Sequence, residues 1–147
     1  MAERFEVAGL RQLGEAMRGL SEDVRTKVAR QAVAAGASVV RKAARDKAPV
    51  DSGNLKASLI MKRIRETNLT EEYIVTPRKG KTRDGKAAKR GQGKLGKDAY
   101  YARFVEFGTV KVPARPFIRP ALEDNVQRAT QAIADRLAAR IKKVSGK

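Results

Sequence analysis

Apolar side chains recur every three or four residues along much of this chain, which is the spacing of amphipathic helices. The longest such run predicts a helix over residues 22–46, with Val24, Val28 and Val39 on its apolar face. Basic residues gather at its C-terminal end, where the helix dipole favours positive charge. The segment 32–38 in the middle is unusually small, so we expect a sheet or another helix to approach the backbone closely there.

The same spacing predicts two further helices, and β-branched residues predict strands. A short helix is expected over 9–19, and Pro120 opens a final helix. Two strands are expected over 58–66 and 71–77, most simply as an antiparallel hairpin, and alternation over 3–7 suggests another short strand. The predicted fold class is therefore α+β, an antiparallel sheet of three to four strands packed by the long helix and the C-terminal helix.

Turn-forming residues separate the long helix from the first expected strand. Asp51, Ser52 and Gly53 form a predicted structural turn, with Asp51 as the candidate cap of a brief helical turn beginning at Ser52. Leu55 and Leu59 are expected to anchor this turn.

The length of 147 residues and the hydrophobic content of 41% are typical of a globular protein, and we expect 1–147 to form a single domain. No stretch approaches the roughly 20 apolar residues of a membrane span, and no export signal is visible, so we expect no membrane partner. Cysteine and histidine are both absent, which removes disulfides and the usual zinc, haem and thiol chemistry. We expect no cofactor, although carboxylate metal sites stay open.

The formal charge of +17 is the second prominent feature, since such an excess commonly reports contact with nucleic acid or an acidic surface. Much of it lies in 77–98, which has five glycines and almost no large apolar residue, and is predicted to project as a basic loop. Two interpretations stay open, a solvated loop ordered on assembly and a surface that contacts DNA or an acidic partner. The candidate contact residues are Arg78, Lys79, Lys81, Arg83, Lys86, Lys89, Arg90, Lys94 and Lys97.

Aromatic residues concentrate in 99–122, which contains five of the seven in the chain. This stretch predicts a short helix that stops at Gly108, followed by a proline-rich arm over 110–120 that is held extended and presents Phe117. The aromatic residues either pack in the protein's own core or mark a surface where another subunit docks. The candidate oligomer interface consists of Tyr101, Phe104, Phe107, Pro116, Phe117 and Ile118.

Catalytic chemistry finds little support in the sequence. Paired carboxylates could be drawn from Asp51, Glu106 and Glu123, but all three are better explained as a cap, a solvated or paired residue and an acid at a helix start. No nucleophile elbow, Walker A loop or dinucleotide fingerprint is present. We therefore predict that the protein is not an enzyme and has no catalytic, cofactor or metal residues.

Three segments, 48–59, 100–109 and 113–122, together resemble the tail-component family of long-tailed bacteriophages, whose members are neck or tail-completion proteins. The matching positions are Asp51, Ser52, Gly53 and Leu55 in the first motif, Tyr101, Glu106, Phe107 and Gly108 in the second, and Pro116, Phe117 and Pro120 in the third. Ser52 replaces the more usual threonine of the family. The length and basicity of 77–98 depart from it.

The resemblance implies a non-enzymatic virion or prophage protein that assembles as a ring, with six-fold closure as the family expectation. Its site is the head–tail junction of the virion, reached from the host cytoplasm during assembly, and its neighbours are the connector or stopper and the tail terminator or tail tube proteins. On this expectation the arm around Phe117 docks on the sheet edge or long helix of the next subunit, and the basic loop faces genomic DNA in the channel or an acidic partner ring. A tail terminator ring and a basic nucleic-acid-binding protein are the alternatives.

Overall fold

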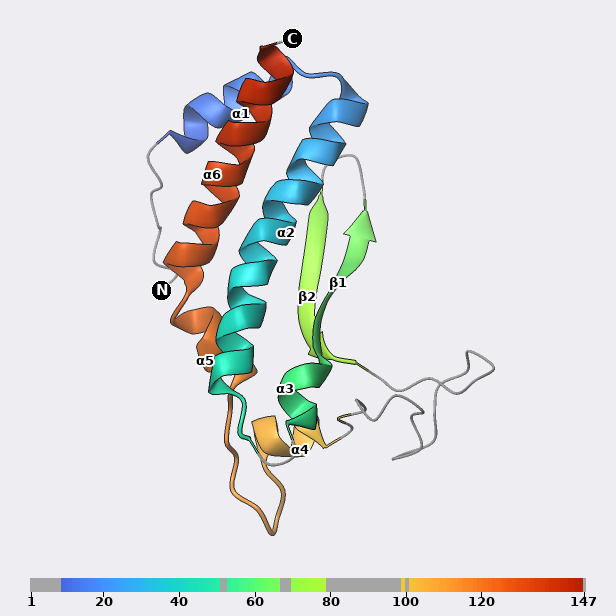
Figure 1. The fold of residues 1–147 in the computed structure, drawn as a ribbon, viewed down its shortest axis with the longest axis vertical. Coiled ribbons are helices and arrows are strands. Elements are labelled where there is room, and N and C mark those ends of the chain that lie inside the picture. The colour runs from blue at the N-terminus through green and yellow to red at the C-terminus, as the bar shows by residue number, and fades with distance from the viewer. Residues whose placement is uncertain (1–8, 51–52, 67–69, 79–98, 100, 147) are drawn as a thin grey trace, which may run out of the picture. The chain divides into compact units, whose positions relative to one another are not determined.

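The computed structural model describes residues 9–50, 53–66, 70–78, 99 and 101–146, and its described part is α+β and mostly helical (Figure 1). The elements in chain order are α1 (Leu10–Arg18), α2 (Glu22–Lys47), α3 (Asn54–Ser58), β1 (Leu59–Glu66), β2 (Glu71–Pro77), α4 (Ala102–Phe107), α5 (Ile118–Glu123) and α6 (Val126–Ser145). The predicted short helix, long helix and two strands are confirmed.

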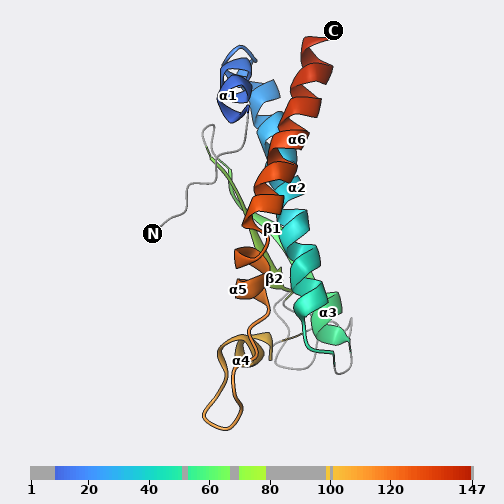
Figure 2. The same ribbon diagram turned by 90° about the vertical axis from the view of Figure 1, so that its left-hand side faces the viewer.

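Contacts group the chain into two units, and the first takes its described residues from Met1–Val39, Arg63–Ile74 and Asn125–Lys147. Within it, α6 runs beside the N-terminal part of α2, and α1 packs against α6 (Figures 1 and 2). A Cβ added at Gly36 would lie 2.7 Å from Ile133 Cγ1 and 3.0 Å from the carbonyl oxygen of Ala129. The expectation of a close approach at the small segment of α2 is therefore confirmed, and α6 is the element that approaches.

The second unit, Val40–Lys62 and Val75–Asp124, has its core around Phe117. The Phe117 side chain is fully buried. Its cluster consists mostly of small residues, which leave room for one large ring: Ala44, Ala48, Leu55, Leu59, Ala99, Ala102 and Ala121. The predicted anchoring role of Leu55 and Leu59 is confirmed. The prediction that the proline-rich arm presents Phe117 to a neighbour is wrong, because burying a Phe side chain stabilises the fold more than leaving it exposed on the arm.

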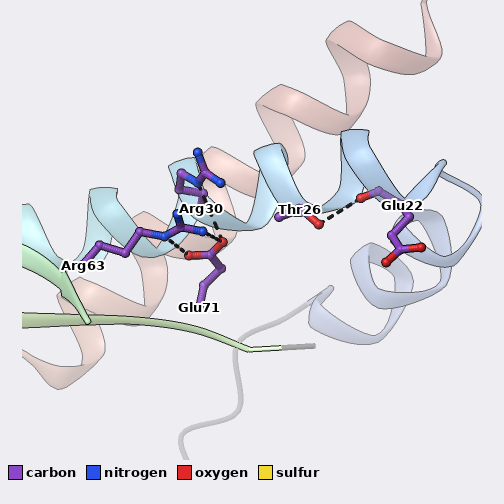
Figure 3. A network of polar contacts seen from close by, with 5 residues as sticks. All are labelled: Glu22, Thr26, Arg30, Arg63 and Glu71. Atoms are coloured by element: carbon purple, nitrogen blue, oxygen red, sulfur yellow. Dashed lines mark hydrogen bonds and ion pairs between the residues drawn. The ribbon is translucent and has the colours of Figure 1, made fainter. Parts of the chain in front are cut away.

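The sheet is an antiparallel pair of strands, β1 and β2. A sheet of three to four strands is not found among the described residues, and the candidate strand over 3–7 lies outside them. One side of the pair carries a partly buried ion pair, in which Arg63 Nε donates to Glu71 Oε2 at 2.7 Å and Arg63 Nη2 donates to Glu71 Oε1 (Figure 3). Arg30 of α2 lies 3.8 Å from the same carboxylate, so this side of the pair faces α2.

The C-terminal helical region is divided in two, where the sequence predicted one helix opened by Pro120. Pro120 is the third residue of α5, inside the first turn, where its missing N–H leaves no helical hydrogen bond unmade. Asp124 and Asn125 separate α5 from α6, and both residue types favour helix ends because their side chains compete for backbone hydrogen bonds. No helix in the described part of the chain is long and apolar enough to span a membrane.

Candidate assembly surface

An apolar loop follows α4 and extends away from it (Figure 2). We call residues 107–112 the finger. The Phe107 side chain is 78% exposed, Val110 is fully exposed and Val112 is more than half exposed. Three large apolar side chains within six residues is a concentration of exposed apolar surface that typically marks an interaction site.

Hydrogen bonds close the finger into a tight turn. The Thr109 N–H donates to the Val112 carbonyl at 2.8 Å, and the Val112 N–H donates back to the Thr109 carbonyl at 3.3 Å. The Thr109 hydroxyl oxygen accepts from the N–H groups of Lys111 at 3.3 Å and Val112 at 3.1 Å. Val110 and Lys111 therefore lie at the tip, held by main-chain and hydroxyl contacts.

Gly108 sets the direction of the finger. Its φ of 74° and ψ of 178° belong to a region that only glycine occupies readily. A Cβ there would lie 2.8 Å from the Ala114 nitrogen and 3.1 Å from the Val112 carbonyl oxygen, so the returning segment also uses the space that glycine leaves. The prediction that Gly108 ends the helix is confirmed, since its N–H bonds to the Phe104 carbonyl at 2.9 Å.

Glu106 ties the far end of the arm back to α4. Its Oε2 accepts from the N–H groups of Phe117 at 2.8 Å and Ile118 at 3.0 Å, and its Oε1 accepts from the N–H of Arg119 at 3.0 Å. These donors are the first N–H groups of α5, which have no partner within that helix. The Arg115 N–H adds a bond of 2.7 Å to the Val105 carbonyl, so the returning segment of the loop is fixed to α4.

The environment of Glu106 favours its charged form. Burial alone would raise the pKa of this carboxyl, but the backbone N–H groups of Phe117, Arg119 and Ile118 and the charge of Arg119 outweigh it and hold the pKa below the ordinary 4.5. The carboxylate is therefore ionised near neutral pH and serves as a charged cap. This geometry gives Glu106 a structural task, as the sequence predicted for it.

A family described as "Bacteriophage HK97-gp10, putative tail-component" has a sequence model that matches residues 11–108, about two thirds of the chain. The chain belongs to this HK97-gp10-like family. It is thus a structural component of a phage tail or neck, and its place is the virion. No curated protein and no solved structure matches it significantly.

The family match of this tail component ends at Gly108, so α4 and its glycine stop lie inside it and the rest of the finger, the arm and α6 lie outside. Among the residues described, no group of three or more acidic side chains is arranged to hold a metal ion.

The structure separates the predicted interface residues of the tail component into two groups. Phe104, Phe107 and Pro116 are exposed. Tyr101 and Ile118 are half-buried and pack against the core that contains Phe117. The core interpretation therefore applies to Tyr101 and Ile118, while docking on another subunit stays a prediction for Phe104, Phe107 and Pro116.

The predicted turn and basic loop are described only at their edges. Gly53 has a φ of 75° and is the N-cap residue of α3, while Asp51 and Ser52 lie outside the described residues. Arg78 is exposed, and its N–H donates to the Ser58 carbonyl at 2.8 Å. The other candidate contact residues, Lys79, Lys81, Arg83, Lys86, Lys89, Arg90, Lys94 and Lys97, lie outside the described residues as well.

Sequence reasoning missed the finger itself. The sequence predicts Val110 and Val112 only as part of the arm, and the local signal for a turn there is Gly108, two residues before Val110. The partners of Glu106 were also missed, because they lie more than ten residues away and no local pattern indicates them.

Proposed function

We propose that this tail component is a ring subunit at the head–tail junction, that it completes the tail or neck, and that DNA passes through the ring. Family membership supports a structural role in the tail or neck. The exposed apolar finger is the observation that carries the proposal of self-assembly, because it offers a surface that a neighbouring subunit would bury.

The finger is suited to docking because it is ordered before it meets a partner. Its turn is closed by the Thr109–Val112 bonds, and its return limb is fixed at Arg115 and by the Glu106 cap. A pre-organised loop loses little conformational entropy on binding, so more of the burial energy appears as affinity. Complete burial of an apolar side chain of this size contributes about 1.5–3 kcal/mol.

A ring needs two different complementary surfaces on each subunit, so that a rotation brings the last subunit back to the first. Six-fold closure, with the connector or stopper on one side and the tail terminator or tail tube on the other, is the arrangement we propose from the family resemblance. The charge of +17 suits a channel that carries DNA, and we propose that the basic loop 77–98 supplies that contact.

The purified full chain tests the proposal by sedimentation velocity and negative-stain electron microscopy. We expect closed rings for the wild type and loss of rings in the double variant Phe107→Ser/Val110→Ser with an unchanged circular dichroism spectrum. Leu122→Ser is the matched control, because Leu122 is half-exposed on α5, outside the finger, and we expect it to keep the rings. A monomer at every concentration would refute ring formation, and normal rings in the double variant would refute the role of the finger.

The same charge favours one other function, a basic nucleic-acid-binding protein. Such a protein would bind duplex DNA as a monomer, with an affinity that falls steeply with salt. Titrating the wild type with a duplex of random sequence at two salt concentrations, beside the sedimentation experiment, separates the two. A monomer with strongly salt-dependent binding supports the alternative, and a ring in the absence of DNA supports the ring proposal.

A further inference from the structure

The outward side of the β1–β2 pair carries exposed isoleucines. Arg63 and Glu71 bond to one another and so share the side that faces α2. Because side chains alternate along a strand, Ile64 lies on the opposite side, and so does Ile74, three residues after Glu71. The Ile64 side chain is 58% exposed and the Ile74 side chain is 41% exposed.

An acidic residue accompanies the isoleucines. Glu72 follows Glu71 directly and therefore also lies on the outward side, two residues before Ile74. We call Ile64, Glu72 and Ile74 the outer sheet face. Lys62, two residues before Ile64, lies on the same side of β1, so this side carries a lysine as well as Glu72.

We infer that the outer sheet face of one subunit receives the finger of the next subunit in the ring. This inference rests on the proposed function, and it names the two surfaces that the ring requires. The finger brings Val110 and Val112, and the outer sheet face brings two isoleucines of similar shape. Lys111, exposed at the tip between the two valines, has the charge that Glu72 complements.

Charge disfavours one competing contact and geometry disfavours both. A contact between two fingers would bring Lys111 against Lys111, which is repulsive. A contact between two outer sheet faces could pair Lys62 with Glu72, but it would leave the apolar finger uncovered. Each of these self-contacts would also join only two subunits by a two-fold axis, whereas a finger on a sheet face is a head-to-tail contact that continues around a ring.

The contact is a recognition element within a larger interface. A stable protein–protein interface buries about 1,200–2,000 Å² in total, more than a six-residue loop on two strands provides. Interfaces nevertheless depend on a few central residues, surrounded by contacts that contribute little binding energy. We place Val110 and Ile74 in that central role, with Lys111 and Glu72 at the rim.

Cross-linking tests the pairing directly, because the natural chain has no cysteine. The full-length double variant Val110→Cys/Ile74→Cys, treated with a short bis-maleimide after assembly, should give a ladder of covalent oligomers on a denaturing gel. Each single-cysteine variant should stay monomeric on the same gel. Val110→Cys/Ala138→Cys is the matched control, since Ala138 is an exposed small residue on α6, and it should give no ladder.

The outcomes separate the two proposals. Rings in the micrographs without a ladder would overturn the finger–sheet contact and leave the ring proposal standing. An intrachain cross-link, seen as a monomer with both cysteines consumed, would overturn the contact as well. If the wild type forms no rings, the proposed function fails and this inference fails with it.

A charge exchange gives independent evidence without cysteines. Lys111→Glu and Glu72→Lys should each weaken assembly about two- to five-fold, the range for an exposed ion pair, and the combined variant should restore it. Glu123→Lys in place of Glu72→Lys should fail to rescue Lys111→Glu, because Glu123 is an exposed acid on α5 and is not part of the outer sheet face. If Glu72→Lys and Glu123→Lys rescue Lys111→Glu equally, or if neither rescues it, the contact between Lys111 and Glu72 is contradicted.

Discussion

Replacing Glu106 by glutamine is the sharpest test of how the arm is held. The carboxylate accepts three backbone N–H bonds, from Phe117, Ile118 and Arg119. In Glu106→Gln the amide oxygen can take the position of Oε2 and keep two of these bonds, but they become neutral. The amide NH2 group then faces the Arg119 N–H, which is exposed and can turn to water.

The expected cost follows from these contacts. A charge-assisted hydrogen bond is about twice as strong as a neutral one, so each of the two retained bonds loses about 1 kcal/mol. The lost interaction between the charge and the N-terminus of α5 adds about 0.3–1 kcal/mol. We expect Glu106→Gln to destabilise the protein by about 2–3 kcal/mol, which lowers the melting temperature by about 5–10 °C in a chain of this length.

Thermal unfolding by circular dichroism measures the whole effect, and hydrogen exchange localises it. In Glu106→Gln the amides of Phe117, Ile118 and Arg119 should exchange faster than in the wild type, while amides in α6 keep their rates. Glu123→Gln is the control, since Glu123 is an exposed acid that pairs only with Arg119 on the same helix among the described residues, and surface changes of this kind stay within about 0.5 kcal/mol.

The pH dependence of the stability difference between wild type and Glu106→Gln is a second check on the capping role. The pKa of Glu106 is lowered on folding, so its contribution to stability is fully present above the unfolded value of about 4.5 and is lost as pH falls through the folded pKa. The difference between wild type and Glu106→Gln should therefore be constant at neutral pH and shrink in acid. A variant as stable as Glu123→Gln at pH 7, or a difference that grows in acid, would refute the capping role.

The other predictions concern the core and the finger. Phe117→Ala should lower the free energy of unfolding, measured in urea, by about 3–5 kcal/mol, because it empties the centre of the second unit. Phe104→Ala should cost far less. A loss below 1 kcal/mol for Phe117→Ala would show that the Phe117 side chain is not part of the core. Gly108→Ala should abolish rings in electron microscopy with a smaller stability loss than Phe117→Ala, since the exposed loop can shift to relieve the clash at Ala114. Gly14→Ala is the matched control, because a Cβ at Gly14 meets open space, and it should keep the rings.

The regular elements could be predicted because their signals are local. The helical spacing of α1 and α2 and the β-branched residues of β1 and β2 are read within one element. The close approach at Gly36 could also be anticipated, since a run of small residues permits contact with whatever comes near. The identity of the approaching helix could not, because Ile133 lies about a hundred residues away in the sequence.

The position of Phe117 could not be predicted for a different reason. Prolines on both sides indicate an extended arm, and that local inference is sound as far as Pro116, which is exposed. Whether the next side chain points outward or inward depends on the small residues that pack around it, such as Ala44, Ala48 and Ala121, and alanines have no distinctive pattern in the sequence. No sequence pattern indicates that Ala102 belongs to the same core either.

The residues that carry the family resemblance hold the loop in place, and they are not its exposed tip. Glu106 caps α5, Gly108 turns the chain, and Phe117 locks the arm into the core. These three contacts determine that a loop is presented and in which direction. The apolar tip, with Val110 fully exposed, makes none of these contacts, so its side chains are free to be matched to a partner surface. The family match covers Glu106 and Gly108 but ends before the tip, so family membership does not determine the docking partner. The finger–sheet experiments therefore pair tip residues outside the matched segment with Glu72 and Ile74 inside it.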